Sequence, residues 1–152
     1  MKVKKIHPDA KLPIRAESRS NGYDLFAVED VFISVGTTAI VPTGIAIELD
    51  VPPFDELLTV FKIEDRSSMA TKGLRTGAGV VDYSYRGEIK VVIHNLNNTS
   101  ESKETGQCGY QIKKGDKIAQ GLVYWTSAED VEETNELNET DRGTNGWGST
   151  GK

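Results

Sequence analysis

An arginine followed by two hydroxyls is the first place in this sequence where anion chemistry could occur. Arg66, Ser67 and Ser68 stand together at the predicted start of a short helix. A guanidinium donates charge-assisted hydrogen bonds to phosphate, and hydroxyls with free backbone N–H groups add further donors. A serine that caps a helix would explain the serines but not the arginine. The segment is therefore typical of a phosphate-binding element.

A second candidate is a glycine-rich segment that carries one carboxylate. Gly79 is followed by Val80, Val81 and Asp82, and Tyr85 comes three residues later. Glycine lets a backbone approach a flat ligand closely, and a carboxylate at the mouth of such a hairpin can orient or deprotonate a water. The alternative is a plain hairpin with an exposed aspartate.

Two further segments contain polar or charged residues that the fold alone does not explain. In the first, an Asn-Gly turn signal precedes Asp24 at the start of a strand. The second is the C-terminal stretch 142–152, which is rich in Gly, Ser and Thr but also contains Arg142 and Trp147. A flexible arm that orders over a ligand would use both of these residues, whereas a frayed terminus would use neither. Composition leaves both interpretations open.

The elements that must position these segments are short strands. Alternating or β-branched runs between Gly, Pro and Asn predict strands at 31–33, 39–41, 44–49, 57–63, 88–94 and 118–125. The one predicted helix covers 67–72 and ends at Gly73. Many short strands with almost no helix favour an all-β domain, either a sandwich, a jelly roll or a barrel.

Length and charge narrow the class of protein. The 152 residues suit one compact domain, and 37% hydrophobic residues are enough to build a core. The net charge of −5 speaks against a broad nucleic-acid surface but not against a small anionic ligand. The sequence has no apolar run near the roughly 20 residues of a membrane span, and its first residues lack a secretory signal. We expect a cytoplasmic protein, or one of the host-cell cytoplasm or nucleus if the source is a virus, that binds neither nucleic acid nor membrane.

Composition changes near residue 127. Residues 128–141 are strongly acidic, which indicates a solvated connector. We therefore expect a single domain over residues 1–152, with a β core at 1–126 and an acidic connector and flexible C-terminal arm at 127–152.

Taken in order along the chain, these segments resemble the five motifs of the trimeric dUTPase family. The motifs are matched by residues 22–25 (Gly-Tyr-Asp-Leu), 66–70 (Arg-Ser-Ser-Met-Ala), 79–88, 115–120 (Gly-Asp-Lys-Ile-Ala-Gln) and 142–151. One Arg-Ser-Ser triplet could arise by chance. Five motifs in the family's order, spread over nearly the whole chain, are specific.

The resemblance implies a fold, an assembly and a reaction. The fold would be a distorted jelly roll of the β-clip type with one short helix, assembled as a homotrimer whose active sites are shared between subunits. The reaction would be Mg²⁺-assisted hydrolysis of dUTP to dUMP and pyrophosphate, which limits uracil incorporation into DNA and supplies dUMP for thymidylate synthesis. In this family the fifth motif reaches across to close a neighbour's site.

The resemblance also implies roles for individual residues. Asp82 would activate the water that attacks the α-phosphorus, Tyr85 would pack on the deoxyribose, and Asp24 would hold magnesium through its waters. The catalytic pair would be Asp82 with Arg142 of the arm. The remaining substrate contacts would come from the uracil-reading backbone of Gly79, Val80 and Val81, from the phosphate ligands Arg66, Ser67, Ser68 and Gln120, and from Trp147, Gly148, Ser149 and Thr150 of the arm.

The sequence departs from the family pattern at a few positions. Asp65 stands beside Arg66, where Pro or Gly is common, and would either pair with the arginine or point away. Gly121 replaces a bulky aliphatic residue, and Thr76 stands where many bacterial members have Asn. None of these changes removes a proposed catalytic group.

Two alternatives belong to other functional classes. A dCTP deaminase shares an Arg-Ser-Ser element, but its hairpin motif differs from the one in this chain. A nucleotide-responsive module that binds a regulatory protein partner could use the same fold, and the sequence leaves that second role open.

Overall fold

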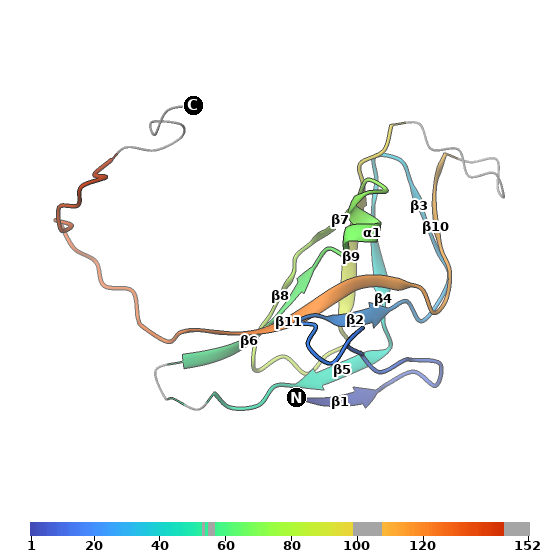
Figure 1. The fold of residues 1–152 in the computed structure, drawn as a ribbon, viewed down its shortest axis with the longest axis horizontal. Helices are drawn as coiled ribbons and strands as arrows, with labels where there is room; N and C mark the ends of the chain where they lie inside the picture. Colours follow the sequence, from blue (N-terminus) through green and yellow to red (C-terminus); the bar gives the residue numbers. More distant parts are fainter. Residues whose placement is uncertain (53, 55–56, 99–107, 145–152) are drawn as a thin grey trace.

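The computed structural model describes residues 1–52, 54, 57–98 and 108–144, and within them the chain consists almost entirely of antiparallel strands (Figure 1). The strands are β1 (Lys2–Lys5), β2 (Tyr23–Phe26), β3 (Val31–Ser34), β4 (Thr38–Pro42), β5 (Ile45–Glu48), β6 (Leu57–Glu64), β7 (Leu74–Gly77), β8 (Val80–Val81), β9 (Lys90–Asn95), β10 (Gly109–Ile112) and β11 (Lys117–Ser127). The helix α1 spans Ser67–Ala70. The all-β, distorted jelly-roll prediction with one short helix is confirmed.

The strands form four small sheets rather than one large one. Their strand orders are β1-β5, β10-β3, β2-β11-β6-β8 and β4-β9-β7. The chain passes from the last of these sheets to the four-stranded one between β7 and β8, where Ala78 has a φ of 48°. A positive φ is unfavourable for a residue with a Cβ, so this corner between two sheets is a strained point of the backbone.

The core lies between the sheets and follows the pleat of the strands. In β6 the residues Thr59, Phe61 and Ile63 are buried and alternate with more exposed positions, and β9 buries Val91 and Ile93 in the same way. Side chains of a strand alternate between its two faces, so each strand needs only every second residue to be apolar. This pattern fixes which side chains remain outside the core and available for a site.

Six predicted strands and the predicted helix are confirmed. The run predicted at 118–125 is part of β11, and the helix is a single turn followed by Gly73 with a φ of 74°. Strands β1, β7 and β10 were not predicted, because each has only four residues and too few apolar side chains to show an alternation.

Beyond β11 the chain leaves the sheets and runs away from the body of the domain (Figure 1). Residues 129–144 are all exposed, which is what the predicted solvated connector requires. In the described part of the chain, no helix is long and apolar enough to cross a bilayer.

Candidate functional site

A buried aspartate anchors two cations at one end of β11. Asp24 of β2 is 7% exposed, and its Oδ1 accepts a hydrogen bond of 2.8 Å from Arg66 Nε. Lys117 Nζ lies 2.7 Å from Asp24 Oδ2 as an ion pair whose angles do not make a hydrogen bond. A buried carboxylate is tolerable only when it is paired, so Asp24 fixes where both positive charges stand.

The same arginine is braced from two other sides. Its Nη1 donates to Ser68 Oγ at 3.1 Å and to the Lys117 carbonyl at 3.2 Å. Arg66 occupies the position before α1, and no side chain caps this helix, so the serines do not serve as caps. Ser67 and Ser68 are exposed, which leaves their hydroxyls accessible to a ligand.

A hollow of about 200 Å³ opens beside this cluster. It is lined by Arg66, Ser68, Met69, Lys72, Tyr110, Ile112, Asp116 and Lys117. Three of these side chains are cationic and one is acidic, so the hollow suits an anion. Sequence reasoning missed Lys117 as a site residue, although it lies within the fourth motif and its position there was the available signal.

Gln120 joins the second and fourth motifs. It lies opposite Asp24 and Glu64 in the two strand pairings of β11, and its Nε2 donates to the Asp65 carbonyl at 2.8 Å. A Cβ on Gly22 would overlap the Gln120 amide. The glycine of the first motif therefore makes room for the glutamine of the fourth, and the three motifs meet at one place.

Asp65 points away from Arg66. Its Oδ1 accepts hydrogen bonds from Thr76 N at 2.6 Å and Thr76 Oγ1 at 2.9 Å, and its Oδ2 lies 2.8 Å from Arg75 Nη1. Of the two outcomes that the sequence left open for this departure, the structure shows the second. The phosphate-binding arginine is not neutralised by its neighbour.

The preceding carboxylate, Glu64, is also paired elsewhere. Lys62 Nζ lies 2.6 Å from Glu64 Oε1. The hydrogen bond to Glu64 and the attraction of its charge raise the pKa of Lys62. Neither carboxylate next to Arg66 thus reduces the positive charge offered to an anion.

The unusual Gly121 is explained by packing. A Cβ at this position would overlap the Phe61 ring, which is fully buried. The Phe61 ring of β6 fills the space beside Gly121 of β11. The core of this chain thus accommodates glycine at the position where the family pattern has a bulky aliphatic residue.

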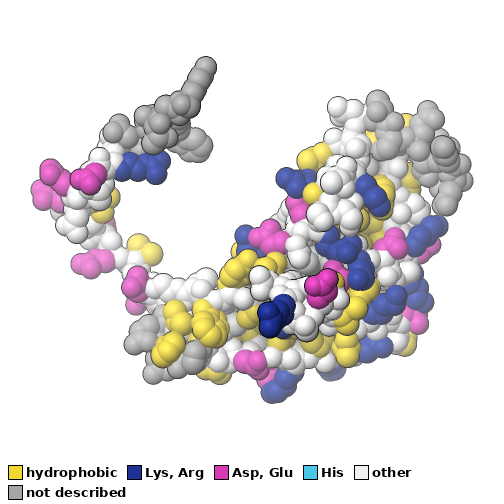
Figure 2. Space-filling view, viewed as in Figure 1, with side chains coloured by type: hydrophobic (Ala, Val, Ile, Leu, Met, Phe, Trp, Pro, Cys, Tyr) yellow, Lys and Arg dark blue, Asp and Glu magenta, His cyan; other side chains and the backbone are white. Residues whose placement is uncertain are grey.

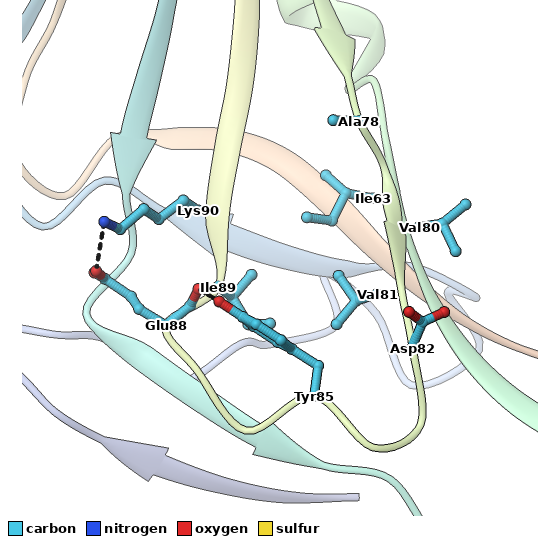
Figure 3. Close-up of a pocket in the computed structure, with 9 residues that line it drawn as sticks. All are labelled: Ile63, Ala78, Val80, Val81, Asp82, Tyr85, Glu88, Ile89 and Lys90. Atoms are coloured by element: carbon cyan, nitrogen blue, oxygen red, sulfur yellow. Dashed lines mark hydrogen bonds and ion pairs between the residues drawn. The ribbon is translucent and has the colours of Figure 1, made fainter.

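A second hollow lies between β8 and β9 and has a volume of about 230 Å³ (Figure 3). It is lined by Ile63, Ala78, Val80, Val81, Asp82, Tyr85, Glu88, Ile89 and Lys90. We call it the hairpin pocket. This volume is below the 300–1,000 Å³ typical of a complete small-molecule site, so it suits one part of a ligand, such as a flat ring.

The loop of the hairpin is held by its own backbone and by Glu88. Tyr85 OH donates to the Glu88 carbonyl at 3.1 Å, and Glu88 Oε1 accepts from Gly44 N at 2.9 Å. Lys90 Nζ lies 3.5 Å from Glu88 Oε2, as drawn in Figure 3. The Tyr85 ring is thereby kept at the lower edge of the pocket.

The two faces of β8 carry different groups. In Figure 3 Val81 points into the space between the strands, while Val80 and Asp82 lie on the outer side of β8. Asp82 is exposed and also lines a separate hollow of about 420 Å³ on that outer side, together with Val80 and Leu58. The carboxylate is therefore at the rim of the hairpin pocket and not at its floor.

Gly79 has a structural role in the pairing of the chain with β6. Its carbonyl accepts a hydrogen bond of 2.7 Å from Ile63 N, and a Cβ on Gly79 would overlap the Ile63 carbonyl. The close backbone approach that the sequence predicts is thus made to β6. What remains for a ligand is the opposite edge of β8, since β8 is the last strand of its sheet.

The carboxylate of the hairpin and the Arg66 cluster stand at different levels along β6. Val81 pairs with Phe61, which places Asp82 next to Val60, whereas Arg66 follows the far end of the strand. Six residues of extended chain, four of them within β6, lead from Val60 to Arg66, which corresponds to roughly 20 Å at about 3.3 Å per residue. Within one chain the motifs thus form two separate groups, the hairpin pocket with Asp82 and the Arg66 cluster. We call these two groups half-sites.

The described residues of the arm, up to Thr144, line neither half-site of their own chain. Arg142 is exposed on the extended segment after β11 and lines neither hollow. The predicted arm contacts Trp147, Gly148, Ser149 and Thr150 lie outside the described residues.

The donor set fits magnesium held through water. In the described part of the chain, no three His, Cys, Asp or Glu side chains gather into a metal cage, but Mg²⁺ usually keeps several waters and binds through one or two carboxylates and substrate phosphates. Asp24 Oδ2 is buried and accepts no hydrogen bond there, and the Lys117 side chain beside it is 37% exposed. Asp24 Oδ2 would hold the metal by accepting a hydrogen bond from one of its waters, in place of the contact with Lys117.

A cationic cluster after the end of β6 and a narrow slot for a flat ring beside β8 define an all-β, nucleotide-binding class of protein. The dUTPase family model matches residues 8–151, so the chain belongs to the dUTPase family. Deoxyuridine 5'-triphosphate nucleotidohydrolase of Helicobacter pylori is 36% identical, over 99% of this chain and 96% of that one.

Solved structures agree with the fold. The dUTPase of Staphylococcus bacteriophage 80alpha with dUPNHPP superimposes with a TM-score of 0.83 and 25% identity, over 99% of this chain and 98% of that one. A dUTPase variant from phage phi11 of S. aureus, whose structure reveals the coordination of a structural Mg(II) ion, has a TM-score of 0.76 and 22% identity over 91% and 98% of the two chains. These matches do not favour the dCTP deaminase or the purely regulatory alternative.

Proposed function

We propose that this chain hydrolyses dUTP to dUMP and pyrophosphate in the cytoplasm, at sites that each combine half-sites of different subunits of a homotrimer. The observation that carries the proposal is the separation of Asp82 from Arg66 along β6. The α-phosphate that Asp82 would face and the phosphates that Arg66 would hold belong to one short triphosphate. A catalytic base must lie within hydrogen-bond reach of the proton that it takes, directly or through one water, so the Arg66 cluster must come from another copy.

The hairpin pocket would hold the nucleoside. The free edge of β8 offers unpaired backbone N–H and C=O groups, which can pair with the edge of uracil. A base with the wrong donor pattern would leave these groups unpaired, and that penalty discriminates strongly. Tyr85 would pack on the deoxyribose and leave no space for a ribose 2′-hydroxyl.

The chemistry would take place on the outer side of the hairpin pocket. Asp82 orients a water and accepts its proton as the water oxygen bonds to the α-phosphorus. The bond from this phosphorus to the oxygen that bridges to the β-phosphate breaks, and pyrophosphate leaves with that oxygen. Phosphoryl transfer depends mainly on positioning and on neutralising charge.

The remaining charges would come from two sources. Arg66, Ser67, Ser68 and Gln120 of a second subunit would contact the phosphates, and Arg142 with Ser149 and Thr150 of an arm would clamp them while Trp147 and Gly148 cover the base. Magnesium, bound to the triphosphate and to Asp24 through water, would neutralise phosphate charge when present.

Uncovered apolar surface supports the assembly. Leu58 and Trp125, on the paired strands β6 and β11, are 52% and 57% exposed, and hydrophobic side chains gather where these strands end in Figure 2. A contiguous apolar face on a single chain is typical of a protein interface. The outer hollow at Asp82 adjoins this face, so a neighbour seated there could bring its cations to the carboxylate.

The test is pyrophosphate release from dUTP, dTTP, dCTP and UTP at equal concentration, with magnesium and with the metal removed by EDTA. We expect release from dUTP alone and only with magnesium. Ammonia release from dCTP would instead indicate a deaminase, and binding of dUTP without cleavage would favour the regulatory role. Light scattering on the same sample should give three times the chain mass of 16.6 kDa, and a monomer would contradict the shared site.

A further inference from the structure

A further hollow, with a volume of about 610 Å³, belongs to neither half-site. It is lined by Arg15, Arg19, Ser20, Asn21, Tyr23, Leu122, Val123 and Tyr124. We call it the arginine groove. The lining contains two arginines and no Asp or Glu, so the groove is positively charged. The side of the groove that β11 forms is mostly apolar, with Leu122, Val123 and Tyr124.

The groove is a built feature and not a loose loop. Arg15 Nη2 donates to Tyr23 OH at 2.7 Å, and the Arg15 guanidinium lies 4.6 Å from the centroid of that ring. Asp24 N donates to the Ile14 carbonyl at 2.7 Å and ties the segment to β2. The Arg19 side chain makes no ion pair or hydrogen bond within residues 1–52, 54, 57–98 and 108–144. One charge is thus held in place and the other is available.

The acidic connector, residues 128–141, has the complementary properties. It holds seven of the 23 acidic residues and none of the 18 basic ones, so the rest of the chain carries a net charge of +2. Its two large apolar side chains, Val131 and Leu137, are 99% and 87% exposed. Figure 2 shows acidic side chains spread along this segment, well away from the body. A binding surface for this segment would have to combine positive charge for the carboxylates with an apolar area for the two exposed hydrophobic side chains.

We propose that the arginine groove docks the acidic connector of a neighbouring copy of this chain, with Arg15 and Arg19 facing its carboxylates and the β11 side receiving Val131 or Leu137. The proposal rests on the shared-site assembly proposed above and names the surface that guides the arm. Docking in the same chain is disfavoured, because β11 stays paired with β6 through Ser127 and the connector then leads away from the groove.

Disulfide trapping tests this docking. The native Cys108 is exposed, so the test uses a Cys108→Ser background with Asn21→Cys in the groove and Val131→Cys on the connector. We expect oxidation to link different chains, seen as dimers and trimers on a non-reducing gel. The control pairs Val131→Cys with Lys4→Cys, an exposed position on β1 outside the groove, and should give few links.

A charge swap tests the electrostatic part. Adding Arg19→Glu to the groove pair should lower the yield of links at least severalfold, and adding Glu132→Lys and Glu133→Lys to that variant should restore it. Links within one chain, or equal yields from the groove and control pairs, would overturn the docking. Trimer mass and dUTP hydrolysis of the wild-type protein are read separately, so failure of the docking can be told from failure of the proposed function.

Discussion

Two inactive variants of this chain should restore each other when they share a trimer. The variants are Asp82→Asn, which removes the water-orienting carboxylate, and Arg66→Gln, which removes the guanidinium but keeps a hydrogen-bond donor for Asp24. General-base catalysis contributes roughly 10²–10⁴-fold, and a positioned arginine contributes on a similar or larger scale in phosphoryl transfer. Each variant alone should therefore fall to about 1% of wild-type activity or less.

The expected recovery follows from the two half-sites. A site that takes its hairpin pocket from one chain and its Arg66 cluster from another is complete only if the first chain has Asp82 and the second has Arg66. In a symmetric shared-site trimer that contains both variants, one of the three sites always meets both conditions. About one third of the wild-type rate should therefore return in hetero-oligomers from which homotrimers have been removed. A site built within one chain would be incomplete in every subunit.

The assay is pyrophosphate release from dUTP by hetero-oligomers, obtained by co-expressing the two variants with different tags and purifying through both. The matched control is Asp82→Asn with Asp82→Ala, which disables the same half-site twice and should recover nothing. Circular dichroism of each variant checks that it is folded. If the mixture stays at the level of the control while both variants are folded trimers, the inference from the roughly 20 Å separation along β6 is wrong.

Three further outcomes are expected. Gly121→Leu should lower the free energy of unfolding by about 1–3 kcal/mol, the usual cost of overpacking, because the new side chain meets the Phe61 ring; urea unfolding measures it, and an unchanged midpoint would mean that Phe61 does not fill that space. Removing residues 142–152 should leave a trimer by light scattering but severely reduce dUTP hydrolysis, and unchanged kinetics would make the arm irrelevant. Tyr85→Ala should narrow the preference for dUTP over UTP in kcat/KM, whereas an unchanged ratio would move sugar discrimination to another residue.

The candidate motifs could be located in the sequence because each of them is a contiguous segment. Two of these segments are Arg66 with its serines and the glycine-flanked run that ends in Asp82. In both, the residue types alone indicate which chemistry is possible. The runs that became β6 and β9 were predictable for a similar reason, since burial of every second residue leaves an alternating pattern that can be read in one strand. Lys117 escaped notice because its role depends on Asp24, which is distant in sequence and reaches it only through the pairing of β2 with β11.

What the sequence by itself determined was the all-β class, the motifs and their order, since these depend on residue types and spacing along the chain. Only the tertiary structure decided how they meet. It turned Asp65 toward Arg75 and Thr76, matched Gly121 with Phe61, and placed Asp82 beside the middle of β6 while Arg66 follows the end of that strand. Each of these outcomes depends on the register between strands, and register is a property of the folded pairing that no single segment contains.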